Sequence, residues 1–375
     1  MRITGAVLEE SGRERPYAAS RPITVGEIDL GDPGPTEVLV AIEAAGVCHS
    51  DLSVVNGNRP RPLPMLLGHE AAGTVVSTGT SVTDLRPGQR VVMSFLPRCE
   101  NCDACERDGQ LPCSEGSRSN NAGKLLHGMG RLSRAGDPVR HHLGVSGFAT
   151  HAIVDRASVV AVGSDVPPEV AALFGCAVLT GGGAILNVAR PQPRDDVMVV
   201  GLGGVGMAAL LTAKAIGVGR IIAVDRMADK LAMARDLGAT ETYTPEQVRD
   251  AGIRVRYVVE CAGHPAALET AYAATAPGGL TITVGLPAPD TNITLPPLSL
   301  TAEARTLVGS YLGSAVPSRD IPRYEDMWCA GRLPVEKLIS ARIELTQINE
   351  AMDLLADGAA VRQVIVFDHS NNGIR

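Results

Sequence analysis

The pattern of apolar and polar residues changes along the chain and separates it into two main parts. From the N-terminus to about Gly175, short β-like runs such as Val38 to Ile42, Gly73 to Ser77 and Arg90 to Ser94 are broken by glycine and proline. Runs of this kind, bounded by turn-forming residues, are typical of strands joined by short loops. The first half of the chain therefore predicts a mostly β domain.

Beyond about Pro193 the pattern changes to an apolar run, a glycine turn and then helical periodicity. This alternation indicates βαβ units around a parallel sheet. The predicted strands are Val197 to Val200, Ile221 to Val224, Val255 to Glu260 and Leu280 to Val284, and the predicted helices are one ending near Ala215, Met227 to Leu237, and one near Pro265 to Thr275.

After about Leu312 this rhythm is lost. A predicted helix over Gln347 to Ala356 and a predicted strand over Arg362 to Phe367 end the ordered pattern. A chain of 375 residues is long enough for two cores. We expect a β-rich domain over residues 1–177, a nucleotide-binding domain over 178–312, and a return to the first domain over 313–375.

Charge and composition narrow the possible partners. The formal net charge is −7, which argues against a nucleic-acid partner. The N-terminus MRITGAVLEESGRERPY lacks an apolar signal region, and we find no apolar stretch of the roughly 18 residues that a membrane span needs. We therefore expect a cytoplasmic protein without a membrane partner, in which eight cysteines are metal ligands or buried thiols.

Four cysteines in one short polar loop are the strongest chemical signal. They have the spacing C-x2-C-x2-C-x7-C at Cys99, Cys102, Cys105 and Cys113. Zinc takes four thiolates in a tetrahedron, and a turning backbone can supply them without distant elements. An iron–sulfur cluster also suits four thiolates, and unrelated buried cysteines are the plain alternative. Because all four positions are cysteine, a zinc here has no open coordination site and is structural.

A glycine-rich turn follows the predicted strand that ends at Val200. Glycines at the positions of G-x-G-x-x-G permit a tight turn and bring backbone amides close to a pyrophosphate at a helix N-terminus. The pattern is carried by Gly201, Gly203, Gly204, Val205 and Gly206. On its own it is weak, because a glycine turn can serve structure alone.

Asp225, at the end of the next predicted strand, strengthens the nucleotide interpretation. It lies 19 residues beyond Gly206, close to the offset of about 20 residues expected of a ribose-binding acid. A carboxylate there accepts hydrogen bonds from ribose hydroxyls and repels a 2′-phosphate, which favours NAD over NADP. Arg226 is the opposing observation, because a guanidinium can accommodate a phosphate.

Three further motifs carry a resemblance to a known family: GVCHSD at Gly46–Asp51, GHE at Gly68–Glu70 and GCAVLTG at Gly175–Gly181. With the cysteine loop, the glycine turn and the closing VRQVIVF, the chain resembles the zinc-containing medium-chain alcohol dehydrogenases. It is most similar to the long-loop type that includes liver alcohol dehydrogenase and thiol-dependent formaldehyde dehydrogenases. The resemblance implies an α/β fold, with a GroES-like catalytic domain beside a doubly wound Rossmann domain and the active site in the cleft between them.

The resemblance also implies a second, catalytic zinc. Its ligands are Cys48, His69 and Cys176, with water or substrate in the fourth position, as a Lewis-acid zinc requires. Glu70 is implied to lie behind the metal, and Asp51 to be the carboxylate that orients the ligand histidine. The link between Cys176 and the other two ligands rests on the family alone.

Other roles follow from the same resemblance. Ser50 is the hydroxyl that takes the proton of the alcohol, but Ser53 stands where liver enzymes end the proton relay with a histidine. His49 replaces an arginine as a contact for the pyrophosphate, and Arg362 is the second cationic contact. Further cofactor contacts are expected at Thr180, Lys230 and Leu286, and walls of the substrate pocket at Phe95 and His142.

Together these features predict an enzyme that interconverts primary alcohols and aldehydes by hydride transfer to or from NAD, with two zinc ions per chain. The segment between Cys113 and His141 resembles that of dimeric members, so we expect a homodimer. Two other hypotheses stay open. The enzyme oxidises a hydroxymethyl–thiol adduct of formaldehyde, or it is a nicotinoprotein, an enzyme that keeps its NAD bound. A non-catalytic relative predicts lost metal ligands, whereas Cys48, His69 and Cys176 are all present.

Overall fold

The computed structural model describes residues 1–368 and divides the chain into two compact units. Unit 1 comprises Met1–Cys176 together with the stretch that begins at Ile339, and unit 2 comprises Ala177–Leu338. The first boundary lies one residue from the predicted position. The second prediction was wrong, because residues 313–338 stay in unit 2 instead of returning to unit 1.

Packing explains why the return to unit 1 comes later than predicted. Helix α12 (Pro317–Cys329) packs against α6 (Leu179–Gly183), which also belongs to unit 2. The sequence pattern loses its βαβ rhythm after the last strand of the sheet, but the chain still adds this helix to the same unit. A change of rhythm therefore marks the end of the sheet and not the end of the unit.

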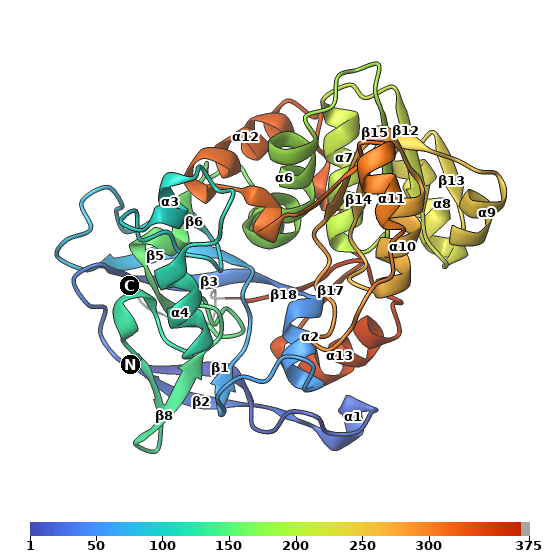
Figure 1. The fold of residues 1–375 in the computed structure, drawn as a ribbon. Coiled ribbons are helices and arrows are strands. Elements are labelled where there is room, and N and C mark those ends of the chain that lie inside the picture. Colours follow the sequence, from blue (N-terminus) through green and yellow to red (C-terminus); the bar gives the residue numbers. More distant parts are fainter. Residues whose placement is uncertain (369–375) are drawn as a thin grey trace. The chain divides into compact units, whose positions relative to one another are not determined.

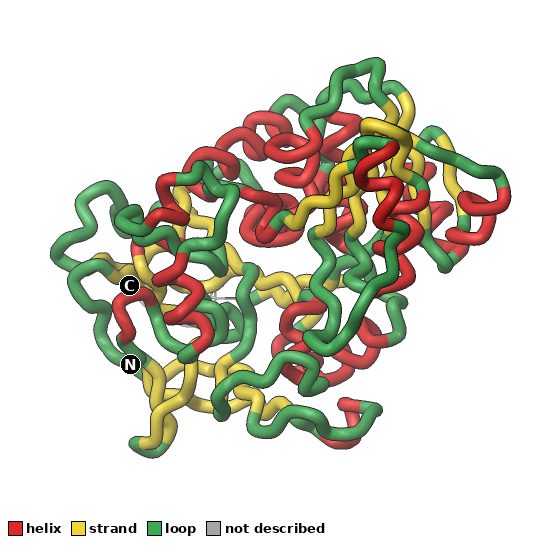
Figure 2. The backbone as a smooth tube through the Cα atoms, in the orientation of Figure 1, coloured by secondary structure: helices red, strands yellow, loops and turns green. Residues whose placement is uncertain are grey.

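Unit 1 is built mainly from strands, as predicted, and Figure 2 shows them as yellow segments joined by green loops. One group closes into a small barrel around apolar side chains that include Ile3, Val7, Ile28 and Leu66. Around the barrel the order is β1 (Arg2–Leu8), β2 (Ile23–Leu30), β7 (Leu132–Arg134), β8 (Asp137–His141) and β4 (Met65–Leu66).

The second sheet of unit 1 positions the chemistry. Its order is β10 (Val159–Ala161), β6 (Arg90–Met93), β5 (Ala71–Thr78), β3 (Glu37–Val47), β18 (Gln363–Val366) and β17 (Ala341–Ile343), and β9 (His151–Asp155) also pairs with β3. The register sets Val47 opposite Gln363 and Ala45 opposite Ala71. Segments far apart in sequence thus meet at the end of β3.

Short helices complete unit 1. The carboxylate of Asp353 accepts hydrogen bonds from the backbone N–H groups of Tyr17 and Ala18, which joins the first and last of these helices. They are α1 (Tyr17–Ser20), α2 (His49–Val55), α3 (Asp103–Glu106), α4 (Ser114–Asn121), α5 (Pro168–Leu173) and α13 (Ile348–Ala356), with 3-10 turns at Leu126–Gly128, Arg156–Ser158 and Leu345–Gln347.

Unit 2 contains a six-stranded parallel sheet. Its order is β13 (Glu241–Tyr243), β12 (Arg220–Val224), β11 (Asp196–Val200), β14 (Val255–Glu260), β15 (Thr275–Thr283) and β16 (Thr306–Gly309), labelled in part in Figure 1. Counted from β11, this order is 3-2-1-4-5-6, the doubly wound arrangement of dinucleotide-binding domains. The predicted Rossmann sheet is therefore confirmed.

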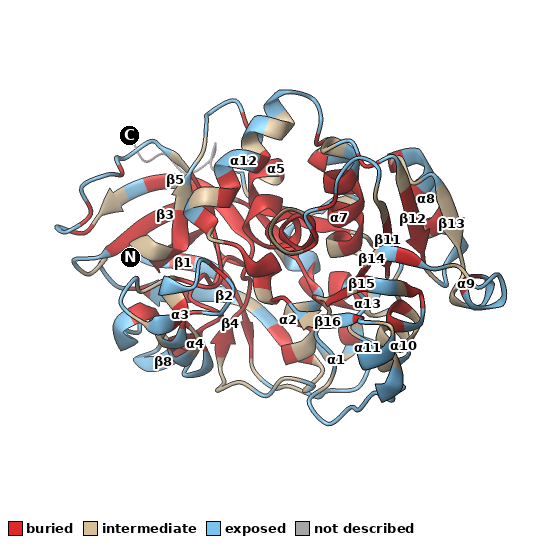
Figure 3. Cartoon of the chain, turned by 45° about the horizontal axis from the view of Figure 1, so that its top comes forward, coloured by how far each residue is buried: buried red, intermediate tan, exposed pale blue. Residues whose placement is uncertain are grey.

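Helices follow the strands of this sheet in alternation. They are α7 (Gly204–Ala215), α8 (Ala228–Leu237), α9 (Pro245–Asp250), α10 (Pro265–Ala273) and α11 (Pro297–Ala302), with 3-10 turns at Tyr311–Ser314 and Val335–Leu338. Helix α7 packs on β11 and β12, and α10 on β14 and β15. The central strands are buried along most of their length (Figure 3), which explains their nearly continuous apolar sequences.

One long apolar helical segment was not identified from the sequence. Pro168–Ala189 spans 22 residues, and its most apolar 18-residue window has a mean hydropathy of 1.7, so the prediction that no stretch has the length and composition of a membrane span was wrong. It joins α5, α6 and two π-helical segments, Phe174–Val178 and Ala184–Ala189. Because 89% of its most apolar window is buried within the protein, the run packs in the core.

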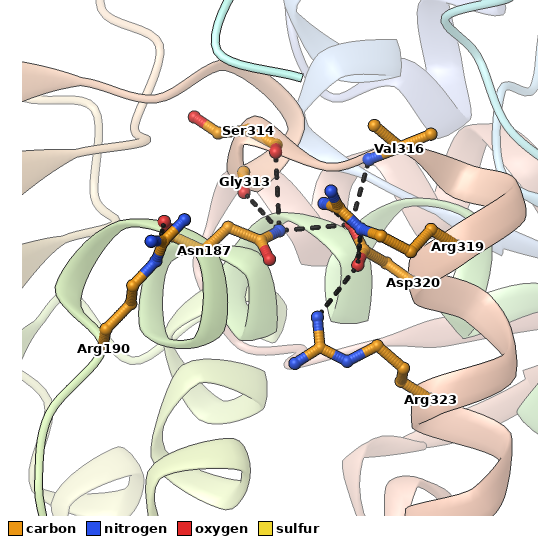
Figure 4. A network of polar contacts seen from close by, with 8 residues as sticks. All are labelled: Asn187, Arg190, Gly313, Ser314, Val316, Arg319, Asp320 and Arg323. Carbon is orange, nitrogen blue, oxygen red and sulfur yellow. Dashed lines mark hydrogen bonds and ion pairs between the residues drawn. The ribbon is translucent and has the colours of Figure 1, made fainter. Parts of the chain in front are cut away.

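The buried carboxylate of Asp320 on α12 is the centre of a polar network in unit 2 (Figure 4). Its carboxylate accepts two hydrogen bonds from Arg319, both at 2.8 Å, and one from the backbone N–H of Val316 at 2.9 Å. Asn187 donates to the same carboxylate and to the carbonyl oxygen of Gly313. The network fixes a turn in which Leu312, Gly313 and Ser314 all have positive φ.

We expect Asp320→Ala to lower the free energy of unfolding by about 2 kcal/mol, because it leaves several half-buried donors without their acceptor. Urea denaturation checks the effect, and Asp326→Ala, an exposed site on the same helix, is the matched control.

The pH dependence of this loss follows from the pKa of Asp320. Burial raises that pKa, but hydrogen bonds from Arg319 and Val316 lower it overall below its usual 3.8. The carboxylate therefore contributes its full stabilisation above about pH 4 and loses it as the pH falls through the folded pKa. The wild-type protein and Asp320→Ala should converge in stability in acid, and a difference that grows there would contradict this account.

Candidate catalytic metal centre, cysteine cluster and nucleotide turn

Three metal-ligand side chains converge in the buried interior of unit 1. They are Cys48 at the end of β3, His69 after β4, and Cys176 in the π-helical turn that follows α5. Their ligand atoms all lie within 4.8 Å of one another, and Sγ of Cys176 lies 3.5 Å from Nε2 of His69. The structure thus brings together the three residues that the family resemblance implied.

This donor set fits zinc. With Zn–N near 2.1 Å and Zn–S near 2.3 Å, tetrahedral angles put nitrogen and sulfur about 3.6 Å apart, close to the 3.5 Å between His69 and Cys176. Two thiols and one imidazole are ligands that zinc prefers. Three protein ligands leave a fourth position for a small molecule, as in catalytic zinc sites.

Two glycines allow His69 and Cys176 to reach this position. Gly68 has a φ of +92°, and a Cβ there would lie 2.5 Å from the backbone nitrogen of Phe148. A Cβ on Gly175 would lie 2.1 Å from the carbonyl oxygen of Met93 on β6. Any other residue forces these segments apart, so both glycines set the positions of the ligands next to them.

The electrostatics favour ionisation of one ligand thiol, that of Cys48. The pKa of Cys48 is held well below its usual value, chiefly by a hydrogen bond from Cys176 and also by the charge of Arg362, against the effect of burial. Burial lowers the pKa of His69, but the charge and hydrogen bond of Asp51 raise it overall. Cys48 is thus prepared to act as a thiolate ligand.

The four cysteines of the polar loop also meet. The sulfur of Cys102 lies 3.6 Å from that of Cys105 and 4.0 Å from that of Cys113. Tetrahedral zinc with ligands at 2.3 Å separates sulfurs by about 3.8 Å, so the cluster has the right size. The backbone N–H groups of Cys99 and Gly116 donate to the sulfur of Cys113, as thiolate ligands require.

The nucleotide turn in unit 2 has the shape that its glycines predict. A Cβ on Gly201 would lie 2.7 Å from the backbone nitrogen of Ala262, and a Cβ on Gly206 would lie 1.9 Å from the oxygen of Gly201. These two glycines permit close packing. Gly203, which caps α7, faces no described atom within 4 Å of the position of a Cβ. A pyrophosphate can approach the backbone there.

Asp225 directly follows β12 and lies beside this turn. Its carboxylate accepts hydrogen bonds from the backbone N–H groups of Leu202 at 2.7 Å and Met227 at 2.9 Å. The acid is therefore fixed next to the glycine turn, where a ribose acceptor is needed. Arg226 is exposed and Lys230 half-buried.

Comparisons with known proteins agree with this arrangement. Residues 34–164 match the family described as alcohol dehydrogenase GroES-like domain, and residues 204–328 match the family described as zinc-binding dehydrogenase. The chain is 36% identical to geraniol dehydrogenase of Castellaniella defragrans over 356 residues, which cover 92% of this chain and 95% of that protein.

Two solved structures have the same fold at 30% identity, each covering 98% of this chain and 100% of its own. One is an alcohol dehydrogenase zinc-binding domain protein from Burkholderia ambifaria, with a TM-score of 0.91. The other is benzyl alcohol dehydrogenase from Acinetobacter calcoaceticus, with a TM-score of 0.89. The chain belongs to the zinc-type medium-chain alcohol dehydrogenase family. It is an oxidoreductase of the alcohol dehydrogenase kind.

The contact between Asp51 and the ligand histidine that the family resemblance implied is present in this dehydrogenase. Oδ1 of Asp51 lies 2.9 Å from Nδ1 of His69, and its Oδ2 accepts the backbone N–H of Cys48 at 3.0 Å. Asp51 occupies the third position of α2, so the helix that Cys48 caps also carries the carboxylate that orients the next ligand.

Arg362, which was expected to contact the pyrophosphate of the cofactor, is buried beside Glu70. The side chain is 3% exposed, its Nη1 lies 3.5 Å from Oε2 of Glu70, and the same nitrogen donates to the carbonyl oxygen of Val47 at 3.3 Å. The charge of Glu70 raises the pKa of Arg362 despite burial. In this dehydrogenase Arg362 compensates the acid beside the metal ligands, and its expected contact with a pyrophosphate stays a prediction.

The two predicted pocket residues both contact the ligand histidine. The rings of Phe95 and His142 each lie 5.5 Å from that of His69 in edge-to-face arrangements. His142 is 1% exposed, so it is no surface histidine, and Nδ1 lies 3.2 Å from Oδ1 of Asp51. The sequence flagged the position but not this contact, since only the fold brings the two segments together.

The remaining predicted residues occupy the first turn of α2 and unit 2. His49 is exposed and Ser50 half-buried, while the hydroxyl of Ser53 donates to the carbonyl oxygen of His49 at 2.8 Å. Thr180 is buried on α6, and Leu286 is exposed beyond β15. Their roles toward cofactor stay predictions.

We expect Cys113→Ser to remove one zinc per chain and to lower the free energy of unfolding by about 3 kcal/mol or more, because binding energy at a structural zinc site is folding energy. Elemental analysis and thermal unfolding measure the two effects. Cys329→Ser, an exposed cysteine outside both clusters, is the matched control. Unchanged zinc content in Cys113→Ser would refute the four-cysteine site.

Proposed function

We propose that this dehydrogenase oxidises primary alcohols to aldehydes with NAD as the hydride acceptor, and catalyses the reverse reduction. The observation that carries the proposal is the convergence of the ligand atoms of Cys48, His69 and Cys176, since a zinc ion held by three protein ligands has one coordination position for substrate. The similarity to dehydrogenases of geraniol and benzyl alcohol supports a primary alcohol whose CH2OH group adjoins a double bond or an aromatic ring.

The reaction removes a proton from the hydroxyl group and a hydride from the carbon that bears it. The products are an aldehyde, reduced nicotinamide and one proton. Cys48, His69 and Cys176 would hold a zinc ion, which when bound acts as a Lewis acid toward the alcohol oxygen. Asp51 keeps the ring of His69 in one orientation and tautomer, through the 2.9 Å contact with its Nδ1.

Ser50 is the proposed acceptor of the alcohol proton. It lies in the first turn of α2, two residues after the ligand Cys48, and is half-buried. Ser53 stands where the relay histidine of the liver enzymes is expected. It does not continue a proton relay, because its hydroxyl already donates to the carbonyl oxygen of His49. We propose that the proton leaves through water.

NAD is proposed over NADP because of Asp225. One carboxylate oxygen accepts the backbone N–H of Leu202, next to Gly203, and the other accepts that of Met227. A fixed carboxylate repels a 2′-phosphate and accepts ribose hydroxyl groups. Arg226 is exposed and has the opposite tendency. A comparison of the two cofactors therefore tests the assignment directly.

His49 favours a second candidate activity, the oxidation of a hydroxymethyl–thiol adduct of formaldehyde. In the family resemblance the CHSD motif is shared with the thiol-dependent formaldehyde dehydrogenases. Turnover of formaldehyde only when glutathione or mycothiol is present selects this candidate. NAD found in the denatured, purified protein would instead select the nicotinoprotein mode, in which the cofactor is not released.

We also propose a cytoplasmic homodimer with two zinc ions per chain. Eight free cysteines and two thiol-rich metal clusters fit a reducing compartment. Within the described part of unit 2, strand β16 pairs on one side only, and Leu298 and Leu300 before it are exposed. An open strand edge with exposed leucines is suited to pairing with a second copy.

A substrate panel tests the proposed function. We expect primary alcohols and their aldehydes to be turned over with NAD in preference to NADP, two zinc ions per chain, and loss of activity of at least about 100-fold in His69→Ala. Spectrophotometric assays and elemental analysis measure these outcomes. Full activity in His69→Ala, or in protein without metal, would refute the proposal.

Ser50→Ala should lower kcat for alcohol oxidation near neutral pH by about 100-fold, the lower end of the range for lost proton transfer. Ser50→Thr retains a hydroxyl and should recover most of the rate. Ser53→Ala is the matched control, because that hydroxyl contacts only local backbone among the described residues. Equal rates in Ser50→Ala and the wild-type enzyme would remove Ser50 from the proton path.

A further inference from the structure

Asp51 is contacted by two histidines, not one. Its Oδ1 lies 2.9 Å from Nδ1 of His69 and 3.2 Å from Nδ1 of His142. The other oxygen, Oδ2, accepts the backbone N–H of Cys48 at 3.0 Å. All these side chains are buried. The carboxylate is therefore held from three directions, and one of them comes from a residue that no motif connects to the metal ligands.

The distances bring the Nδ1 atoms of two imidazoles to one carboxylate oxygen. Each carboxylate oxygen has about two lone-pair positions, so Oδ1 can accept one bond from each histidine. A neutral imidazole whose Nδ1 carries the hydrogen donates to Asp51 and leaves Nε2 as an acceptor. Among the described residues, neither ring nitrogen of His142 makes a hydrogen bond of regular geometry, and the polar contact of this ring is the 3.2 Å approach of its Nδ1 to Oδ1 of Asp51.

The backbone around His142 is fixed independently. Its N–H donates to Oγ of Ser146 at 2.9 Å, and its carbonyl oxygen accepts the N–H groups of Val145 and Ser146. The ring also packs edge-to-face on the ring of His69, with 5.5 Å between centroids. Because the turn is fixed, the ring of His142 has a defined position and can restrict the position of the Asp51 carboxylate.

We propose that His142 is a positioning residue of the catalytic metal centre, which holds Oδ1 of Asp51 so that Asp51 keeps the ring of His69 aimed at the metal. The proposal rests on the proposed function, because it concerns the same centre. It differs from the role of pocket wall expected at the sequence level. A pocket wall acts on the substrate, whereas a positioning residue acts on the metal before any substrate is bound.

Three variants separate these roles by where they place a donor. Phenylalanine keeps a ring of similar size without any donor. The side-chain NH2 of asparagine falls near the place of Nδ1, and that of glutamine near the place of Nε2. A positioning role through Nδ1 therefore predicts that His142→Asn resembles the wild-type enzyme, while His142→Phe and His142→Gln share the defect.

The experiment measures the metal centre without substrate. In the zinc-loaded enzyme, we expect His142→Phe to release its catalytic zinc to a chelator about tenfold faster than the wild-type protein does. This is the lower end of the effect on metal affinity when a residue that supports a metal ligand is replaced. Zinc in the four-cysteine cluster is the internal reference and should leave at an unchanged rate. In cobalt-substituted protein, the visible ligand-field bands should shift in His142→Phe and return in His142→Asn.

His141→Phe is the matched control. The neighbouring His141 is equally buried, but its Nε2 accepts the backbone N–H of Arg131 and serves the loop. That variant should lose thermal stability and keep the wild-type cobalt spectrum. Unchanged zinc release and spectrum in His142→Phe, or wild-type behaviour in His142→Gln with a defect in His142→Asn, would overturn the proposal. Wild-type protein with no cobalt spectrum at Cys48 would instead overturn the proposed function.

Discussion

The structure depends on holding several ionisable groups together in one buried site. Cys48, His69 and Cys176 are buried together with Asp51 and other charged side chains. Burial of an isolated charge costs several kcal/mol or more, so each group must have a partner. Asp51 compensates His69, and a buried cation compensates the acid behind the ligands. Two pairs of opposite charges thus surround the three ligands, and the ligands themselves suit a zinc ion.

Strand β3 is the element on which this set is assembled. Its last residue precedes Cys48, its pairing with β18 brings Arg362 to the same end, and its pairing with β5 does the same for Glu70. A Cβ on Gly46 would lie 2.0 Å from the carboxylate of Glu70. A shift of register by one residue would move all of these side chains to other positions. The sheet therefore serves as the scaffold of the chemistry.

Unit 2 solves a different problem with similar means. A dinucleotide needs backbone N–H groups within reach, and side chains must be absent where the backbone turns. Gly201 and Gly206 remove side chains that would collide with the fold, whereas Gly203 leaves open space in front of α7. Asp320 fixes a left-handed turn after the last strand by the same logic of complete hydrogen bonding. In both units, close approach and full pairing decide which residue types are possible.

Local patterns in the sequence determined the two kinds of unit, the cysteine cluster and the glycine turn, because each is set by neighbouring residues. The family resemblance supplied Cys176, which no spacing connects to Cys48. Only the tertiary structure decided that residues 313–338 stay with the parallel sheet, that Arg362 contacts Glu70, and that His142 shares Asp51 with His69. These outcomes depend on contacts between segments up to hundreds of residues apart, and local periodicity carries no information about such contacts.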